Sequence, residues 1–257
     1  MAFEKLIVER DGDVAIICIN DPASLNALTV ELCEELNSAF DAAACSSRAI
    51  ILTGEGRAFC SGANLDPSIP LPEDFGLVLD THVNPLMLKL RDLPVPWISA
   101  VRGAAAGVGC ALALAADLIV ASESAFFLQA FVRIGLSPDG GSSHLLMRAV
   151  GRARAMEMMM LGERIAAAQA LEWGLINRLT SEEQLSAEAL GLARKLAQGP
   201  TRSLGLIRRL GWTAADQDFE TTLKAERITQ NSAGRTADAL EAITAFQEKR
   251  PARFTGA

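Results

Sequence analysis

The chain has 257 residues and a mass of 27.3 kDa, which is enough for one substantial domain, or for one domain with a smaller appendage, and argues against two full domains. Half of the residues are hydrophobic and 21% are charged, a composition that argues against long disorder. With 24 Lys and Arg against 31 Asp and Glu, the net charge of −7 opposes a general affinity for nucleic acids or anionic membranes.

The cysteines and the N-terminal residues indicate the cellular compartment of the protein. Five cysteines are widely spaced and form no C-x-x-C pair, which indicates free thiols in a reducing compartment. The first residues, MAFEKLIVERDGD, lack the basic start and apolar core of a secretory signal. The longest uncharged run, 103–116, is too short to cross a bilayer. We therefore expect a cytoplasmic protein without a membrane segment.

The first half of the chain alternates predicted strands and helices. Residues 3–10 and 13–19 flank an Asp-Gly turn signal, which predicts an antiparallel hairpin. A helix follows, with Thr29 as its N-cap and its end near Ala44. The next predicted elements are a strand at 49–54, a helix near 82–91, a strand at 96–101, a helix at 107–115 and a strand at 117–121. This alternation predicts parallel pairing with helices outside the sheet.

From Gly141 onward the pattern is nearly all helical, apart from a strand expected at Leu175–Leu179 after the helix stop at Gly174. The C-terminal part predicts two or three amphipathic helices, at about 201–210, 216–230 and 235–249. Such helices cannot bury their own apolar faces, so we expect them to pack on the core or on another subunit.

Two loops with small residues follow predicted strands. SGANL, 61–65, comes shortly after the strand at 49–54, and GAAAGVG, 103–109, leads into the helix at 107–115. Backbone N–H groups in such loops can approach a ligand, or a developing oxyanion, at the edge of a parallel sheet. The alternatives are a plain turn for the first loop and close helix–strand packing for the second. The residues alone leave these alternatives open.

Common nucleophile and metal sites have no support in the sequence. There is no G-x-S-x-G elbow and no P-loop lysine, and His82 and His144 show no spacing that would pair them with a nucleophile or a metal. We expect both histidines at the surface or at a helix edge, and we predict no metal site. Cys60 and Cys110 flank the two loops, and we expect both thiols to be buried and inert.

Asp139 is the carboxylate within the stretch GLSPDGG, 135–141. Because this stretch leads directly into the helical run SSHLLMRAV, the side chain could cap that helix. Alternatively, a carboxyl group among apolar residues could transfer a proton. The residues alone leave both roles open.

Several long blocks are characteristic of one family: SGANL, GAAAGVGCALALAADLIVAS, GLSPDGGSSHLLMRAVGRARAMEMMMLGERIAAAQALEWGLI and AFQEKRPARFTG. Together they resemble the crotonase (enoyl-CoA hydratase/isomerase) superfamily over essentially the whole chain. Within that superfamily, GAAAG, the GL-x-PD-x-G block, GRARAM, ALEWG and RFTG are most similar to the bacterial ring-1,2-epoxyphenylacetyl-CoA isomerases.

This resemblance implies an α/β fold built as a spiral of ββα units, with a helical C-terminal region that builds trimers, often paired into hexamers. We accordingly expect residues 1–195 to form the spiral core with the acyl-CoA site, and residues 196–257 to form the trimerisation region. The implied substrate is an acyl-CoA thioester. No separate cofactor is expected, because coenzyme A is part of that substrate.

The resemblance also assigns catalytic groups. The N–H groups of Ala63 and Val108 correspond to the oxyanion hole, whose donors each stabilise an enolate oxygen by about 3–4 kcal/mol. The two glutamates of the family's hydratases correspond to Ala111 and Phe131, neither of which can activate water. Asp139 matches the acid/base aspartate of the epoxide and dienoyl-CoA isomerases, which favours the catalytic role, although the carboxylate could also cap the helix.

The binding of coenzyme A is implied in the same way. The residues expected to line the adenine and pantetheine path are Ala23, Ser24, Ala27, Ser61, Asn64 and Leu65. Phe246 and Lys249 of a neighbouring subunit are expected to close over the nucleotide. The basic residue that the family often has near Ala23 is absent, which makes Lys249 more important. The alternative for Lys249 is a solvated charge at a helix end.

The sequence thus predicts an acyl-CoA isomerase that moves a double bond or opens a ring epoxide, with Asp139 as a single proton shuttle. Two alternatives are an enoyl-CoA hydratase with atypical catalytic residues and a non-catalytic acyl-CoA binder that has lost both family glutamates. The segment 67–85 should shape the acyl pocket but shows no pattern that predicts the acyl group. Its prolines indicate a mobile loop that could act as a lid.

Overall fold

The computed structural model describes residues 3–65, 68 and 73–257, so residues 67 and 69–72 of the segment 67–85, which could act as a lid, lie outside the described residues. The fold is α/β, with a large sheet in the order β1-β2-β3-β5-β7-β10 and a small sheet in the order β4-β6-β8-β9. The strands of the large sheet are Leu6–Asp11, Val14–Ile19, Ala49–Gly54, Trp97–Val101, Leu118–Ser122 and Arg178–Thr180. Those of the small sheet are Ala58–Cys60, Ala104–Ala106, Phe126–Leu128 and Arg164–Ala166.

The predicted hairpin and the parallel pairing are both confirmed. β1 and β2 pair antiparallel from Leu6 opposite Ile19 to Asp11 opposite Val14, and Gly12 takes the left-handed φ of 58° that the turn requires. From β2 onward, each strand of the large sheet pairs in parallel with its neighbour.

Successive strands alternate between the two sheets, and this alternation makes the fold a spiral. β3, β5 and β7 lie in the large sheet, while the strand that follows each of them, β4, β6 or β8, lies in the small sheet. Helices α2 (Asn84–Asp92), α3 (Val108–Leu114) and α4 (Ser142–Ala149) come after these strand pairs. The chain therefore repeats a ββα unit.

The small sheet is absent from the sequence-based expectation. Each of its strands has three residues, which is too short to show a period of two. The stretch 104–106, expected to be part of a glycine loop, is strand β6, and SGANL follows β4 rather than β3. The strand expected at Leu175–Leu179 forms at Arg178–Thr180, and Leu175 and Ile176 are buried core residues that precede it.

Helices cover both faces of the large sheet. α1 (Val30–Ser46) is capped by Thr29, whose hydroxyl accepts the Leu32 N–H at 3.2 Å, and its side chains pack in one core with Ile50 of β3. α7 (Leu185–Ala197) packs in a second core with Ile51, the next residue of β3. Because neighbouring side chains of a strand point to opposite faces, the two cores lie on the two sides of the sheet.

The remaining short elements connect these layers. They are α5 at Gly151–Leu161, α6 at Ala167–Glu172, the π-helix η2 at Leu79–Val83, and the 3₁₀ turns η1 at Pro22–Ser24 and η3 at Ala130–Ile134. The helix expected near 82–91 is confirmed as η2 running directly into α2.

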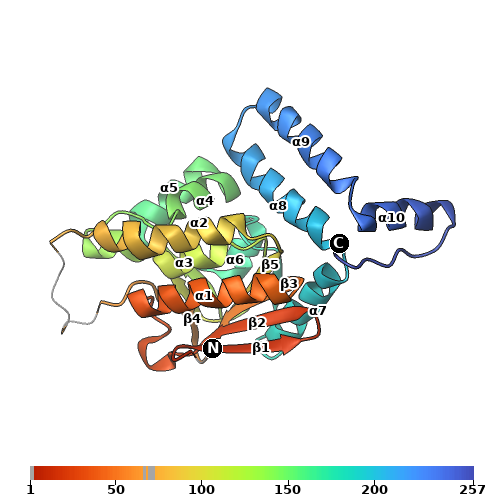
Figure 1. Cartoon of the computed structure of the whole chain (residues 1–257). Coiled ribbons are helices and arrows are strands. Elements are labelled where there is room, and N and C mark those ends of the chain that lie inside the picture. Colours follow the sequence, from red (N-terminus) through yellow and green to blue (C-terminus); the bar gives the residue numbers. More distant parts are fainter. Residues whose placement is uncertain (1–2, 66–67, 69–72) are drawn as a thin grey trace.

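The C-terminal region is three helices, α8 at Thr201–Asp216, α9 at Phe219–Ala233 and α10 at Ala237–Gln247. All three match predicted helices, and α8 continues to Asp216, beyond the expected end near 210. α8 and α9 form a hairpin that stands away from the sheets, and α10 extends to one side (Figure 1).

In a single chain this region leaves many large apolar side chains exposed: Ile207, Phe219, Leu223, Ile228, Leu240, Ile243 and Phe246. Their burial against another subunit stays a prediction. Within the described part of the chain, none of the helices combines the length and apolar character that a membrane span requires.

Candidate active site

Three segments meet at one edge of the small sheet. SGANL, 61–65, follows β4, Gly107 and α3 follow β6, and Gln129 with η3 follows β8. β6 pairs in parallel with both β4 and β8, so the carboxyl ends of these strands lie side by side. Ligands of open α/β sheets bind at such an edge.

The first two of these segments are in direct contact. Gly62 has a φ of 99°, and a Cβ on it would lie 2.8 Å from the carbonyl oxygen of Ala106 and 3.6 Å from the Cα of Gly107. Only glycine combines this backbone conformation with this approach. The contact brings Ala63, the residue after Gly62, close to Val108, the residue after Gly107.

The N–H groups of Ala63 and Val108 are free within the described part of the chain. Ala63 bridges Leu28 in parallel: the Leu28 N–H donates to Gly62 and the Leu28 carbonyl accepts from Asn64, so the Ala63 N–H points away from Leu28. Val108 is the first residue of α3 and has no preceding turn to accept its N–H.

Asp139 lies beside this helix start. A Cβ on Gly140 would be 2.8 Å from Cγ2 of Val108 and 3.3 Å from Cβ of Ala111, so the turn that carries Asp139 rests on the first turn of α3. Oδ1 of Asp139 is buried, and no hydrogen-bond partner for it exists among the described residues. Burial raises the pKa of this carboxyl from 3.8 to about 6.

The expectation that the Asp139 side chain also caps the following helix is wrong. The N-cap of α4 is Gly141, and no side chain caps this helix. Asp139 contributes its main-chain carbonyl oxygen, which accepts the Ser142 N–H at 2.9 Å. Its carboxyl group is therefore left without the capping hydrogen bonds that would lower its pKa.

The two positions that correspond to the hydratase glutamates hold apolar side chains in the same neighbourhood. Ala111 is on α3 and is fully buried, with its Cβ near Gly140. Phe131 is in η3 and is 7% exposed, and its ring lies 3.7 Å from the place that a Cβ on Gly107 would occupy. Ala111 adds apolar surface beside the turn that carries Asp139, and neither side chain supplies a proton-transferring group.

The structure brings the residues expected on the coenzyme A path together in one chain. The Ser61 N–H donates to the Leu25 carbonyl at 3.1 Å, and the Ser61 hydroxyl donates to the Ser24 carbonyl at 3.3 Å. The Ser24 hydroxyl in turn accepts the Ala27 N–H at 3.2 Å. The segment with Ala23, Ser24 and Ala27 therefore lies along the segment with Ser61, Asn64 and Leu65.

Sequence reasoning missed Asn26, which holds these segments in place. Its side chain is fully buried, and Nδ2 donates to the carbonyls of Glu55 at 3.0 Å and Ala58 at 2.7 Å, while Oδ1 accepts the Asp21 N–H at 2.9 Å. Its φ of 58° is left-handed, a conformation that asparagine tolerates better than most residues. An asparagine within the otherwise apolar stretch LNAL, 25–28, is the signal that could have found it.

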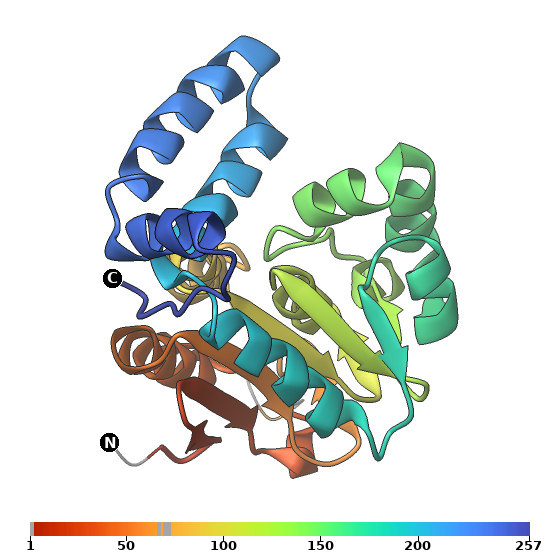
Figure 2. The same ribbon diagram turned by 90° about the vertical axis from the view of Figure 1, so that its right-hand side faces the viewer.

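Phe246 and Lys249 do not join the site within one chain. Phe246 is 85% exposed on α10, and Lys249 follows the helix as an exposed residue with a φ of 55°. α10 lies away from α4 and α5 in both views (Figure 2), whereas the end of α8 contacts α4 through the Arg148–Asp216 ion pair at 3.1 Å. The expected part of Phe246 and Lys249 in binding therefore needs a second subunit.

The two cysteines beside the loops are buried and the two histidines are partly exposed, as the sequence predicted. Cys60 and Cys110 are fully buried, and burial raises the pKa of Cys60 to about 11 and that of Cys110 to about 12. His82 and His144 are partly exposed on helices, where they face Glu34 and Asp216. The described residues contain no group of His, Cys, Asp or Glu side chains that could hold a metal ion.

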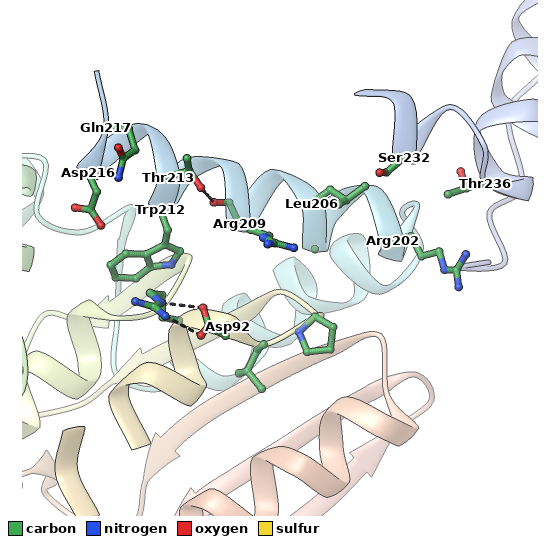
Figure 3. Close-up of a pocket in the computed structure, with 14 residues that line it drawn as sticks. Asp92, Arg202, Leu206, Arg209, Trp212, Thr213, Asp216, Gln217, Ser232 and Thr236 are labelled. Atoms are coloured by element: carbon green, nitrogen blue, oxygen red, sulfur yellow. Dashed lines mark hydrogen bonds and ion pairs between the residues drawn. The ribbon is translucent and has the colours of Figure 1, made fainter. Parts of the chain in front are cut away.

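A separate groove of about 770 Å³ lies between the end of α2 and the helices of the C-terminal region (Figure 3). The Trp212 ring projects from α8 toward Asp92, whose carboxylate pairs with Arg91 at 2.8 Å. Asp139, Ala63 and Val108 are not among the residues that line this groove. It is therefore distinct from the site at the edge of the small sheet.

Comparisons with known proteins agree with this fold. The model of the enoyl-CoA hydratase/isomerase family matches residues 9–257. The chain is similar to the 1,2-epoxyphenylacetyl-CoA isomerase of Escherichia coli strain K12, with 42% identity over 98% of this chain and 99% of the relative. It is also similar to a probable enoyl-CoA hydratase of Rhodobacter capsulatus, with 38% identity over 100% of both chains. A solved enoyl-CoA hydratase subunit I from Geobacillus kaustophilus superposes with a TM-score of 0.94, at 34% identity and 99% coverage of each chain.

Proposed function

The chain belongs to the enoyl-CoA hydratase/isomerase family, and we propose that it is an acyl-CoA isomerase that moves a double bond or opens a ring epoxide. The observation that carries this proposal is the carboxyl group of Asp139. The side chain is half-buried, and its Oδ1 is buried without a hydrogen-bond partner among the described residues. The turn that carries it rests, through Gly140, on the helix start that holds the free N–H of Val108.

In the proposed mechanism, the thioester oxygen of the substrate accepts hydrogen bonds from the N–H groups of Ala63 and Val108. Asp139 removes a proton from the carbon alpha or gamma to the thioester, and the electron pair moves into an enolate. The two donors each stabilise the enolate oxygen by about 3–4 kcal/mol. Asp139 then returns the proton to another carbon, so the double bond moves and no group is added.

The pKa of Asp139 suits a group that must both take and return a proton. At about 6, it leaves the carboxyl largely ionised at neutral pH, yet basic enough to accept a proton more readily than an exposed aspartate does. A general acid/base works best when its pKa lies near the operating pH. Burial of the carboxyl group is the physical cause of this raised pKa.

The second candidate is an enoyl-CoA hydratase with atypical catalytic residues, which the name of the Rhodobacter capsulatus relative favours. Hydration requires a base and an acid that handle water at the double bond, and Ala111 and Phe131 cannot supply them. The name of the Escherichia coli relative supports the isomerase. The non-catalytic acyl-CoA binder is the third possibility that a test must separate.

The proposal includes the assembly and the handling of coenzyme A. The substrate is an acyl-CoA thioester whose nucleotide part runs along Ala23 to Ala27 and Ser61 to Leu65 of one subunit. Phe246 and Lys249 of a neighbouring subunit close over it in a homotrimer, or in a hexamer of two trimers. The reaction needs no separate cofactor, because Asp139 carries the proton and coenzyme A is part of the substrate.

A product screen tests this function. Purified protein is incubated with 3-enoyl, dienoyl and ring-epoxide CoA esters, and products are analysed by mass spectrometry and NMR. An isomerase gives a product of unchanged mass with a rearranged carbon skeleton or double bond. A product heavier by one water identifies the hydratase, and binding by calorimetry without conversion of any ester identifies the non-catalytic binder. Either of these results overturns the proposal.

A further inference from the structure

The RFTG motif at 253–256 has no part in the proposed reaction, yet its backbone is held by a buried carboxylate. Asp238, in the first turn of α10, is 2% exposed. Its Oδ1 accepts the Thr255 N–H at 2.7 Å and the Thr255 hydroxyl at 3.2 Å, and its Oδ2 accepts the Gly256 N–H at 2.8 Å. Hydrogen bonds to an ionised acceptor are the strong ones, so Asp238 fixes the chain end to α10.

The same chain end is tied to the body of the molecule by Arg48, which lies between α1 and β3. Its guanidinium donates to the Phe254 carbonyl at 3.2 Å, the Gly199 carbonyl at 2.6 Å and the Thr201 hydroxyl at 2.8 Å. Gly199 and Thr201 are where the C-terminal region begins, and Phe254 is near its end. One side chain therefore holds both ends of that region.

Gly256 is the point where these two anchors meet. It has a φ of 85°, and a Cβ on it would lie 2.9 Å from the Thr201 hydroxyl oxygen and 3.1 Å from Nε of Arg48. A residue with a side chain would be strained by this backbone conformation and would push against both groups. This close contact explains why the last position of the RFTG motif is glycine.

The chain reversal between α10 and the motif is held in the same way. Lys249 has a left-handed φ of 55°, which is uncommon for a lysine. The next residue, Arg250, pairs with both carboxylate oxygens of Glu241 on α10, at 2.6 and 2.9 Å. Glu241 also accepts the Arg253 N–H at 3.0 Å. The direction in which Lys249 leaves the helix is thus set by the residues that follow it.

We propose that residues 253–256 are a C-terminal strap, held by Arg48 and Asp238, that positions Lys249 to bind the nucleotide phosphates of the acyl-CoA in a neighbouring subunit. This inference rests on the proposed function, because it takes Lys249 as the phosphate-binding cation. Arg48, Asp238 and Gly256 are positioning residues that touch no substrate. Because α10 has few buried side chains of its own, the strap is what orients it.

The substitution Gly256→Ala tests the strap. We expect the KM for the CoA ester to rise about tenfold, as for the loss of one hydrogen bond to a charged group, while kcat stays unchanged. The KM for the same acyl group on pantetheine, which lacks the nucleotide, should not change. Gly191→Ala is the matched control, because a Cβ there meets nothing within 4 Å. Asp238→Asn should act in the same direction if Gly256→Ala does not fold.

A double-mutant cycle distinguishes an effect of Gly256 on the position of Lys249 from a general effect on the fold. Lys249→Met should raise the KM for the CoA ester as Gly256→Ala does, and the double variant should be no worse than Lys249→Met alone, since the strap acts through Lys249. Additive effects, an unchanged KM in Gly256→Ala, or an equal loss with the pantetheine ester would overturn the proposal.

The strap can also be tested without turnover. If no ester is converted, the proposed function fails, and calorimetry with free coenzyme A then measures the strap alone. The dissociation constant of coenzyme A should rise about tenfold in Gly256→Ala relative to wild type and to Gly191→Ala. An unchanged dissociation constant would refute the strap, whatever the fate of the proposed reaction.

Discussion

Asp139 is a carboxyl group whose burial is not compensated. Buried carboxylates are normally paired with a cation or supplied with hydrogen-bond donors. Oδ1 of Asp139 has neither among the described residues, and the helix that begins beside it is capped by Gly141 instead. Uncompensated burial destabilises the ionised form, so the feature that suits proton transfer also weakens the fold at neutral pH.

This trade-off predicts a pH-dependent stability. Because burial raises the pKa of Asp139 from 3.8 to about 6, the native state binds its proton more tightly than the unfolded state. The contribution of Asp139 to the free energy of unfolding should therefore fall as pH rises from about 4 to about 6, and then level off. Asp139→Asn should remove this loss and stabilise the protein at neutral pH by about 1–2 kcal/mol, discounted for partial exposure. Urea unfolding of both proteins across this range measures it, and a variant less stable than wild type at neutral pH contradicts it.

Residue by residue, the site was only partly predictable. Asp139 could be singled out as a candidate because a lone carboxylate in an apolar, glycine-rich stretch is visible in the sequence. Ala63 and Val108 could be named only by resemblance, because the groups that matter are backbone N–H donors and the side chains carry no signal. The capping role was wrong because the glycine at 141 takes the N-cap position without a side chain, which residue preferences do not predict.

At the scale of elements, the start of α3 is the part that organises the site. Its first N–H has no partner among the described residues, Gly140 rests on its first turn, and Gly107 before it contacts Gly62. The small sheet sets this arrangement, because the strand before α3 lies between the strands that lead into the other two segments. That sheet was not predicted from the sequence, since strands of three residues show no periodicity, whereas the longer helices and strands of the large sheet were.

Replacing Val108 with proline tests the helix start directly. Proline fits the first position of a helix, where its missing N–H breaks no intrahelical hydrogen bond. Val108→Pro should therefore keep the fold but lower kcat by about 10²–10³-fold, because one oxyanion donor is lost. Val108→Ala is the control, since it trims the side chain and keeps the N–H. Steady-state kinetics measure kcat for both variants. Equal kcat values would show that this N–H is no oxyanion donor.

At the scale of the whole molecule, a buried ion pair joins the C-terminal region to the core. Nε of Arg208 on α8 lies 2.5 Å from Oδ2 of Asp117, which also accepts the Trp97 N–H at 2.8 Å. Nη2 of Arg208 donates to the Leu90 carbonyl at the end of α2. The three C-terminal helices were predictable from amphipathic periodicity, but this attachment was not, because its partners are far apart in sequence.

Removing one partner of this ion pair should lower the free energy of unfolding substantially. Arg208→Leu leaves the Asp117 carboxylate buried without its cation, and burial already raises the pKa of that group. We expect the free energy of unfolding to fall by about 3–5 kcal/mol. Lys224→Ala, which breaks an exposed pair with Glu220, should change it little. Chemical denaturation measures both, and comparable effects of the two substitutions would contradict the structural role of Arg208.

The exposed apolar side chains of the C-terminal helices predict an assembly. Large apolar surfaces on a single chain are normally covered by a partner. We expect sedimentation velocity to give a trimer or a hexamer, and Ile228→Glu, which places a charge on an exposed apolar position of α9, to shift the protein toward monomer. A wild-type monomer at micromolar concentration would contradict this expectation and would leave Lys249 without a neighbouring site.

Turnover and binding by the Asp139→Asn variant test the proposed chemistry most directly. Asparagine preserves the shape of the side chain but cannot accept and return a proton, so kcat should fall by about 10²–10⁴-fold. The dissociation constant for the CoA ester, measured by calorimetry, should stay close to that of wild type. Glu172→Gln, at an exposed carboxylate on α6, should leave both quantities unchanged. Near-wild-type turnover by Asp139→Asn would contradict the assignment of this carboxyl as the proton shuttle.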